Sequence, residues 1–352
     1  MVGSHFSRRT TQSAASGLVI QHKNFYGEVS PPVVPPGWDD WHGQVEQVGG
    51  TPFYNYSVFE NGVLVNYGSQ PQDYSTDVFG AKVVQFIEST PPGQPLFAYF
   101  SPRPPGDTPA PSDIGSFASF PPWRPPSYNE ADVSDKPFWV RQLPLITQTQ
   151  ASTADTFHQQ QLESLQALDR VVADIIDALT RTGRLNNTVI IFTSDNGMTW
   201  GEHRWLNKKW APYEESVKVP LWIRVPGIPG RSEDRVTVNV DFAPTFAEWA
   251  GVVPSTKVDG FSLATLLKDP SAPWPTERLL EYLGTRDIHG VAEKRFQAVR
   301  TLQYVYAEYD NGDREFYDLF ADPYQLTNAI NDPTYTSIIT VLRKVLAVMK
   351  NE

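Results

Sequence analysis

The stretch TVIIFTSDNGMTWGEHRWLNKKWAPYEESVKVP, from Thr188 to Pro220, decides the fold of this chain. It opens on an apolar, β-branched run that predicts a buried strand, and Asp195, Asn196 and Gly197 follow directly. In open α/β sheets, ligands bind beyond the carboxyl ends of the strands. A carboxylate and an amide oxygen side by side suit a hard cation such as Ca²⁺ or Mg²⁺. The alternative is an ordinary turn, because Asp, Asn and Gly are common turn residues.

Three further polar side chains follow in the same stretch. His203 can donate to an anion or carry a proton near neutral pH, and Lys208 and Lys209 supply point charges suited to phosphate or sulfate. The alternative for the lysines is a solvated loop. Pro212 to Glu215 and the apolar run Val219 to Trp222 flank them closely, so we expect this loop to fold back over the sheet edge.

Composition excludes several other classes of protein. The 352 residues are 40% hydrophobic, enough for one large α/β core or for one core and a small second domain. The net charge of −11 makes a nucleic-acid partner unexpected. Zero cysteines exclude disulfides, thiolate metal sites and a cysteine nucleophile. No long apolar run predicts a membrane span. The polar N-terminal sequence is not expected to act as a signal peptide, so the compartment stays open.

Hydrophobic periodicity predicts strands and helices in alternation. Tyr54 to Tyr67 alternates around Asn61-Gly62, which indicates a hairpin. Thr153 to Thr182 is the clearest amphipathic helix. The other expected elements are strands at 17–20, 95–100, 188–193 and 219–225, a helix at 77–88 with Val78, Ala81, Val84 and Ile87 on its buried face, a helix at 241–250, and mostly loop at 28–52 and 101–137.

This order of elements favours an α/β fold with a mainly parallel sheet flanked by helices. After residue 280 the pattern changes to antiparallel strands around Asn311-Gly312-Asp313 and a closing helix from Thr336 to Lys350. We therefore expect a disordered or non-homologous segment at 1–16, an α/β domain at 17–275, and a small C-terminal antiparallel-sheet subdomain at 276–352.

Several strings together resemble a known family. They are SDNG, GEHR and PYEES within Thr188 to Pro220, PPGWDDW at 35–41, YSTD at 74–77, PPSYNEADVSDKP at 125–137, DFAPT at 241–245 and EFYDL at 315–319. In their order along the chain they resemble the type I sulfatases of the alkaline-phosphatase-like superfamily, and most of all its arylsulfatase and N-acetylglucosamine-6-sulfatase branch. The resemblance covers roughly residues 17 to 350. It implies an alkaline-phosphatase-like fold and sulfuric ester hydrolysis of aryl or amino-sugar sulfates, with a sulfate ester or a sulfated glycan as the partner.

The resemblance also implies roles for individual residues. Asp195 and Asn196 match two ligands of the family's metal, usually calcium. Lys209 matches the lysine that binds the substrate sulfate, and His203 matches the active-site histidine of the GEH string. Lys23, within HKNFYG, resembles a second substrate-binding lysine.

Other parts of the family's site have no counterpart in this sequence. The resemblance implies a formylglycine nucleophile made from Cys or Ser in a C/S-x-P/A-x-R string, but the chain has no cysteine, and Ser4 to Arg8 (SHFSR) lacks the proline. The resemblance implies that the family's first strand, with two calcium-binding aspartates, should precede the nucleophile, and there is no room for it here. The histidine expected after Phe97 to Phe100 is Gly106 here. We therefore expect an incomplete calcium site and no catalysis by this chain alone.

Three hypotheses follow. The first is a sulfatase-family protein that in its complete form hydrolyses sulfuric esters. The second is a non-catalytic pseudosulfatase that binds a sulfated glycan or a protein partner. The third, an alkaline-phosphatase-like enzyme acting on phosphate esters or phosphonates, is disfavoured by the PYEES and NEADVSDKP strings.

Overall fold

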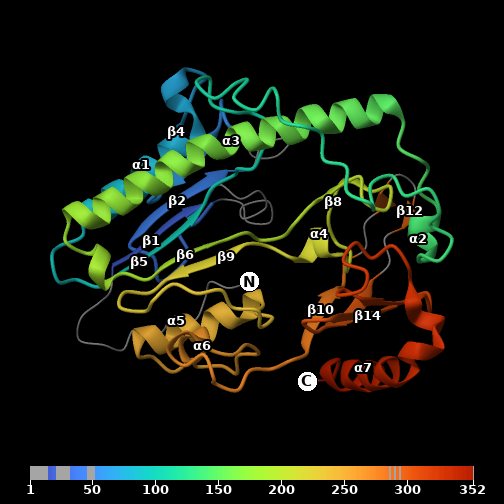
Figure 1. Cartoon of the computed structure of the whole chain (residues 1–352). Coiled ribbons are helices and arrows are strands. Elements are labelled where there is room, and N and C mark those ends of the chain that lie inside the picture. Colours follow the sequence, from blue (N-terminus) through green and yellow to red (C-terminus); the bar gives the residue numbers. More distant parts are fainter. Residues whose placement is uncertain are drawn as a thin grey trace. The chain divides into compact units, whose positions relative to one another are not determined.

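The computed structural model describes residues 15–20, 32–45, 52–284, 287–288, 291–292 and 295–351. They form two compact units (Figure 1). The first unit takes its residues from 1–121, 156–189 and 254–256, and the second from 122–155, 190–253 and 257–352. Helix α3 (Gln148–Arg181) begins in the second unit and continues into the first.

A five-stranded sheet organises the first unit, in the order β4-β3-β2-β1-β5. Strand β1 (Ala15–Ile20) pairs in parallel with both β2 (Asp40–Val45) and β5 (Leu96–Ser101). The pairs of β2 with β3 (Ser57–Glu60) and of β3 with β4 (Val63–Asn66) are antiparallel. The strands predicted at β1 and β5 are confirmed, but the described sheet is mixed rather than mainly parallel.

Strand β2 lies within residues 28–52, for which the sequence predicts mostly loop, and this prediction is wrong for Asp40–Val45. Its sequence DWHGQV is polar, yet its four central residues are buried. His42 explains part of this, because its Nε2 lies 2.9 Å from Asp40 Oδ1 and its Nδ1 lies 3.7 Å from Glu60 Oε2. A buried polar strand with paired side chains lacks the apolar pattern that sequence reasoning relies on.

The hairpin of β3 and β4 is confirmed, with its turn where it was predicted. Asn61 and Gly62 both have positive φ, 48° and 97°, as a two-residue hairpin turn requires. Asn61 also bonds back to β2, because its Oδ1 accepts from the Trp41 N–H at 2.7 Å.

Helix α1 (Ser75–Ser89) follows the predicted span closely but buries a different face. The apolar residues it buries are Phe79, Val83, Phe86 and Ile87. Of the residues predicted for its buried face, only Ile87 is fully buried, and Ala81 is exposed. Gly80 explains the rotation. A Cβ there would lie 2.5 Å from Val171 on α3, so the two helices meet at a glycine that carries no apolar signal.

The second unit contains the stretch from Ile190 to Pro220, which carries most of the predicted site residues. Strand β6 (Ile190–Thr193) pairs antiparallel with β9 (Leu221–Arg224). Both were predicted as buried strands, but Phe192 and Trp222 face one another across the pair and are 41% and 72% exposed. The prediction from apolar composition is therefore right about the position of these strands and wrong about how deeply they are buried.

Short elements complete the region around this strand pair. They are the hairpin β7 (Thr199–Trp200) with β8 (Leu206–Lys208) and the helices α2 (Phe138–Arg141), α4 (Glu214–Val217), α5 (Phe242–Ala250) and α6 (Leu263–Lys268). The helix predicted at 241–250 is confirmed as α5. Its first turn is anchored by buried Asp241, which accepts from the Phe261 N–H at 2.9 Å and pairs with Arg278.

A four-stranded antiparallel sheet in the order β10-β13-β14-β15 forms the C-terminal part of the second unit. Its strands are β10 (Arg278–Tyr282), β13 (Phe296–Arg300), β14 (Tyr304–Tyr309) and β15 (Arg314–Asp318). Helix α7 (Thr336–Met349), red in Figure 1, packs on it through Leu342 and Leu346. The predicted C-terminal antiparallel sheet and closing helix are confirmed. β10 was missed, and the strand expected over 295–309 is two strands.

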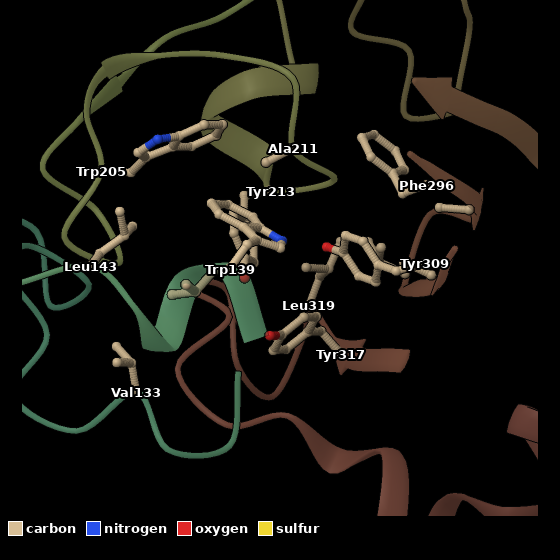
Figure 2. Close-up of a cluster of buried hydrophobic side chains, with 14 residues drawn as sticks. Val133, Trp139, Leu143, Trp205, Ala211, Tyr213, Phe296, Tyr309, Tyr317 and Leu319 are labelled. Carbon is tan, nitrogen blue, oxygen red and sulfur yellow. The ribbon is translucent and has the colours of Figure 1, made fainter. Parts of the chain in front are cut away.

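Aromatic residues dominate the core on the other side of this sheet. Figure 2 shows Trp139, Trp205 and Tyr213 meeting Tyr309 and Tyr317 in one cluster. The remaining short elements are the 3₁₀ turns η1 (Pro71–Asp73), η2 (Leu185–Asn187), η3 (Asn239–Asp241), η4 (Ala329–Asn331) and η5 (Pro333–Tyr335), and the strands β11 (Asp287–Ile288) and β12 (Val291–Ala292).

Within the described part of the chain, no helix is both long and apolar enough to cross a membrane. The domain boundary near residue 275 stays a prediction, as does the assignment of residues 1–16, most of which lie outside the described residues.

Candidate active site

The turn after β6 presents the predicted acid and amide together. Asp195 is exposed and Asn196 is half-buried. The Asn196 N–H donates to Asp195 Oδ1 at 2.9 Å, and the Ser194 hydroxyl donates to the Asn196 carbonyl at 3.1 Å. These local bonds hold the turn in one conformation, with the carboxylate toward solvent.

Gly197 is required by a close backbone approach. Its N–H donates to the Ser216 carbonyl at 2.9 Å. A Cβ at this position would lie 1.9 Å from the Glu215 carbonyl oxygen, so no residue with a side chain fits without a backbone shift. The start of α4 and the Asp195–Asn196 turn are therefore fixed against each other.

Lys209 reaches the same turn from the neighbouring hairpin. Strand β8 pairs with β7 through Thr199 and Lys208, and Lys209 follows immediately. Its Nζ donates to Asn196 Oδ1 at 2.8 Å. The structure thus brings Asp195, Asn196 and Lys209 together, although thirteen residues separate the lysine from the amide. An ammonium held at a strand end can attract an anion even on an acidic protein.

His203 lies in a different environment, completely buried. Its Nδ1 donates to Glu130 Oε2 at 2.7 Å, and its ring lies 4.3 Å from that of Tyr213. Its Nε2 is buried and has no hydrogen-bond partner among the residues that the structure describes. The catalytic role of His203 stays a prediction. The geometry places its ring inside the protein, against Glu130.

Two glutamates border this histidine. Buried Glu202 accepts from the Trp123 indole N–H at 2.7 Å and from the Trp200 N–H at 2.5 Å. Burial, with the charge of Glu202 second, raises the pKa of Glu215 to about 7. A carboxyl group that is partly neutral at physiological pH repels a nearby anion less than an ordinary glutamate does.

A buried carboxylate on the C-terminal sheet, which sequence reasoning missed, supports the site through Tyr213. Glu315 on β15 is completely buried and accepts from three tyrosine hydroxyls: Tyr213 at 2.8 Å, Tyr309 at 2.5 Å and Tyr317 at 2.5 Å. Burial raises the pKa of Glu315, against the opposing effect of these bonds.

Tyr213 links this cluster to the turn, because it caps α4 and α4 holds Gly197. The contacts of Glu130 with His203 and of Glu315 with Tyr213 could not be recognised from a local pattern, because these partners lie 73 and 102 residues away. The EFYDL string contains Glu315, but it marks the family rather than the contact.

Lys23 and Gly106 are the two remaining positions that the resemblance singles out. Lys23 is not among the described residues, so its placement beside a substrate stays a prediction. Gly106, where the resemblance leads us to expect a histidine, leaves no space for a side chain, because a Cβ there would lie 2.5 Å from the Phe53 ring.

The described residues do not by themselves fit a complete calcium site. Asp195 and Asn196 offer two oxygen ligands, and the amide oxygen already accepts from Lys209. Calcium takes six to eight oxygen ligands. In the part of the chain that the structure describes, no group of three or more His, Cys, Asp or Glu side chains has a metal-binding arrangement.

Two family descriptions match the sequence. The description "Sulfatase" matches residues 29–252, and "N-sulphoglucosamine sulphohydrolase, C-terminal" matches residues 201–352. Among curated proteins, the arylsulfatase of Volvox carteri is 31% identical over 378 residues, covering 90% of this chain and 56% of that protein. Human N-acetylglucosamine-6-sulfatase is 29% identical over 330 residues, covering 84% and 59%. The chain thus spans little more than half the length of these two relatives.

Solved structures support the same fold. One, determined in complex with its substrate D-glucosamine-2-N,6-O-disulfate, matches with a TM-score of 0.79 and 21% identity, over 96% of this chain and 80% of that one. The phosphonate monoester hydrolase of Agrobacterium radiobacter matches with a TM-score of 0.64 and 21% identity, over 81% and 62%.

These structures define an α/β protein of the alkaline-phosphatase-like fold. Because the sulfatase description matches more than half of its residues, the chain belongs to the sulfatase family. The fold class and the family that the motifs predict are confirmed.

Proposed function

We propose that Lys209 binds the sulfate group of a sulfate ester, and that the site serves the hydrolysis of sulfuric esters of amino sugars or aryl groups. The observation that best supports this proposal is the 2.8 Å contact of Lys209 Nζ with Asn196 Oδ1 at the carboxyl end of β6. This contact holds a half-buried ammonium at the edge where ligands of α/β sheets bind. The names of the relatives, an arylsulfatase and an N-acetylglucosamine-6-sulfatase, support the substrate class.

The neighbouring residues take supporting roles in this proposal. Asp195 and Asn196 would contribute two oxygen ligands to a calcium ion. We assign His203 as a positioning residue, because it is completely buried and its Nδ1 is bonded to Glu130. Lys23 would provide a second cationic contact to the sulfate.

Replacing Lys209 by alanine is expected to weaken sulfate binding about 10- to 100-fold, because a hydrogen bond to a charged group contributes about 1.5–3 kcal/mol. Isothermal titration with glucosamine 6-sulfate measures the change. Lys218→Ala removes the same charge from an exposed position at the end of α4 and should bind as the unmodified protein does. Equal affinities for the Lys209 variant and the unmodified protein would contradict the proposal.

The absence of cysteine favours a second candidate function, a non-catalytic pseudosulfatase that binds a sulfated glycan or a protein partner. Nucleophilic catalysis needs a residue that forms a covalent intermediate, and the SHFSR string at Ser4 to Arg8 is the nearest match to the formylglycine string.

We therefore expect the purified 352-residue chain to bind glucosamine 6-sulfate without turning over a chromogenic aryl sulfate. Release of the chromophore, followed by absorbance with calcium present, tests this. Turnover that is lost in Lys209→Ala would instead establish the chain itself as a hydrolase. Turnover that survives in Lys209→Ala and co-purifies with the chain would show a hydrolase that does not depend on the Lys209 contact, and would contradict the role proposed for this lysine.

A further inference from the structure

Backbone strain is concentrated beside the proposed sulfate contact. Four non-glycine residues between 203 and 210 have positive φ: His203 at 50°, Arg204 at 67°, Asn207 at 55° and Trp210 at 78°. Asparagine tolerates this region of φ, but for a bulky aromatic residue it is a genuine outlier. Such residues persist where the surrounding structure determines them, and they cluster at ligand sites. Trp210 is therefore held in place at a conformational cost.

The Trp210 ring lies directly beside the lysine. Lys209 Nζ is 5.8 Å from the centroid of the indole, and the same Nζ contacts Asn196 Oδ1 at 2.8 Å. The ammonium proposed to bind sulfate and the indole are therefore neighbours. A ligand large enough to extend from the sulfate over Trp210 would contact both.

The indole is also rigidly supported. Trp210 is half-buried and packs against the aromatic core of Figure 2. Its ring centroid lies 6.2 Å from that of Tyr282 on β10, with the planes inclined by 31°. Tyr282 in turn stacks on Phe296 at 6.4 Å. A ring fixed in this way binds a flat partner without losing side-chain freedom.

From these contacts we infer that Trp210 forms a subsite for the sugar ring of the sulfate ester, next to the sulfate contact of Lys209. The ligand is a pyranose bearing a sulfate group. The C–H face of a pyranose is apolar and matches the face of an indole, whereas its hydroxyls remain toward water. This inference rests on the proposed function and adds to it, because it favours a sulfated sugar over a small alkyl sulfate.

A different role for Trp210 would leave the same contacts. The indole could act only by holding Lys209 in position through the ammonium–ring contact. In that case its removal would weaken every sulfate ligand equally, whatever group the sulfate carries.

Titrations with two probes separate these roles. Ligand-observed NMR measures the binding of glucosamine 6-sulfate and of methyl sulfate to the unmodified protein, to Trp210→Ala and to Trp210→Phe. We expect Trp210→Ala to bind the sugar sulfate about tenfold more weakly and methyl sulfate within about twofold of the unmodified protein. Trp210→Phe keeps an aromatic face and should lose less affinity for the sugar sulfate than Trp210→Ala does. Trp222→Ala removes a 72% exposed tryptophan from β9 and should change neither affinity.

The other results overturn the inference. An equal loss for both ligands in Trp210→Ala, or no loss for either, removes the sugar subsite and leaves the Lys209 contact standing. If the unmodified protein binds neither ligand, the proposed function fails and the subsite fails with it. If Trp210→Ala does not fold, judged by thermal melting, the same comparison is made with Trp210→Phe. A reduced preference for the sugar sulfate in Trp210→Phe, with methyl sulfate bound as by the unmodified protein, is then the supporting result. An equal loss for both ligands, or no loss for either, overturns it.

Discussion

Replacing Glu315 by alanine is expected to lower the free energy of unfolding by about 3–5 kcal/mol, because it leaves three buried tyrosine hydroxyls without their acceptor. Tyr213, Tyr309 and Tyr317 all donate to this carboxylate, and Glu315 and two of these tyrosines are at most 1% exposed. Each unsatisfied buried hydroxyl costs about 1–3 kcal/mol. The deleted side chain also leaves a cavity, which adds to the loss.

Urea denaturation, followed by tryptophan fluorescence, measures this change. Glu281→Ala is a matched control, since Glu281 lies on β10 of the same sheet, is exposed, and accepts from Gln297 Nε2 at 3.1 Å. Its expected effect is within about 0.5 kcal/mol. Glu315→Gln retains one acceptor oxygen and should fall between the two. Equal destabilisation by the two alanine variants would show that the tyrosines find other acceptors when Glu315 is removed.

Parts of the fold were predictable because their signals are local. The hairpin of β3 and β4 depends on Asn61 and Gly62, whose positive φ values a two-residue turn demands. Helix α3 carries apolar residues at helical spacing along much of its length. In both cases the interactions that specify the structure lie within one element, so the sequence pattern expresses them directly.

Other parts depend on contacts that no local pattern contains. Strand β2 is buried through polar pairs, of which His42 with Asp40 is one. The buried face of α1 is set by Gly80, which lets Val171 of α3 approach. Sequence reasoning weighs apolar side chains and therefore overlooks both a polar strand and a glycine contact.

The candidate site divides in the same way. Asp195, Asn196 and Lys209 could be proposed because all three follow a strand within one short stretch, and the structure brings them together. The residues that support this site could not be predicted from the sequence. Glu130 pairs with His203 and Glu315 with Tyr213 across 73 and 102 residues, and only the folded chain shows those contacts.

Gly197→Ala is expected to lower both stability and ligand binding, because the new methyl group collides with backbone atoms. The added Cβ would lie 1.9 Å from the Glu215 carbonyl oxygen and 2.9 Å from its carbonyl carbon. Neither atom belongs to a flexible side chain, so the Asp195–Asn196 turn or the start of α4 must move. Overpacking of this kind costs typically about 1–3 kcal/mol of stability. The hydrogen bond from the Gly197 N–H to Ser216 would be strained as well.

The same shift should reduce sulfate binding at least tenfold, since Asn196 is adjacent to Gly197 and orients Lys209 through its amide oxygen. Calorimetric titration with glucosamine 6-sulfate and a urea melt, run on the same sample, separate the loss of binding from the loss of folding. Gly230→Ala is the matched control, because a Cβ there meets no described atom within 4 Å, and it should leave both measurements unchanged. If Gly197→Ala loses stability but keeps its sulfate affinity, the turn does not position Lys209, and the lysine must be oriented by its own hairpin. A loss of affinity larger than the Lys209→Ala change would instead indicate that Asp195 and Asn196 contact the ligand or its metal directly, because displacing the turn removes them together with the lysine.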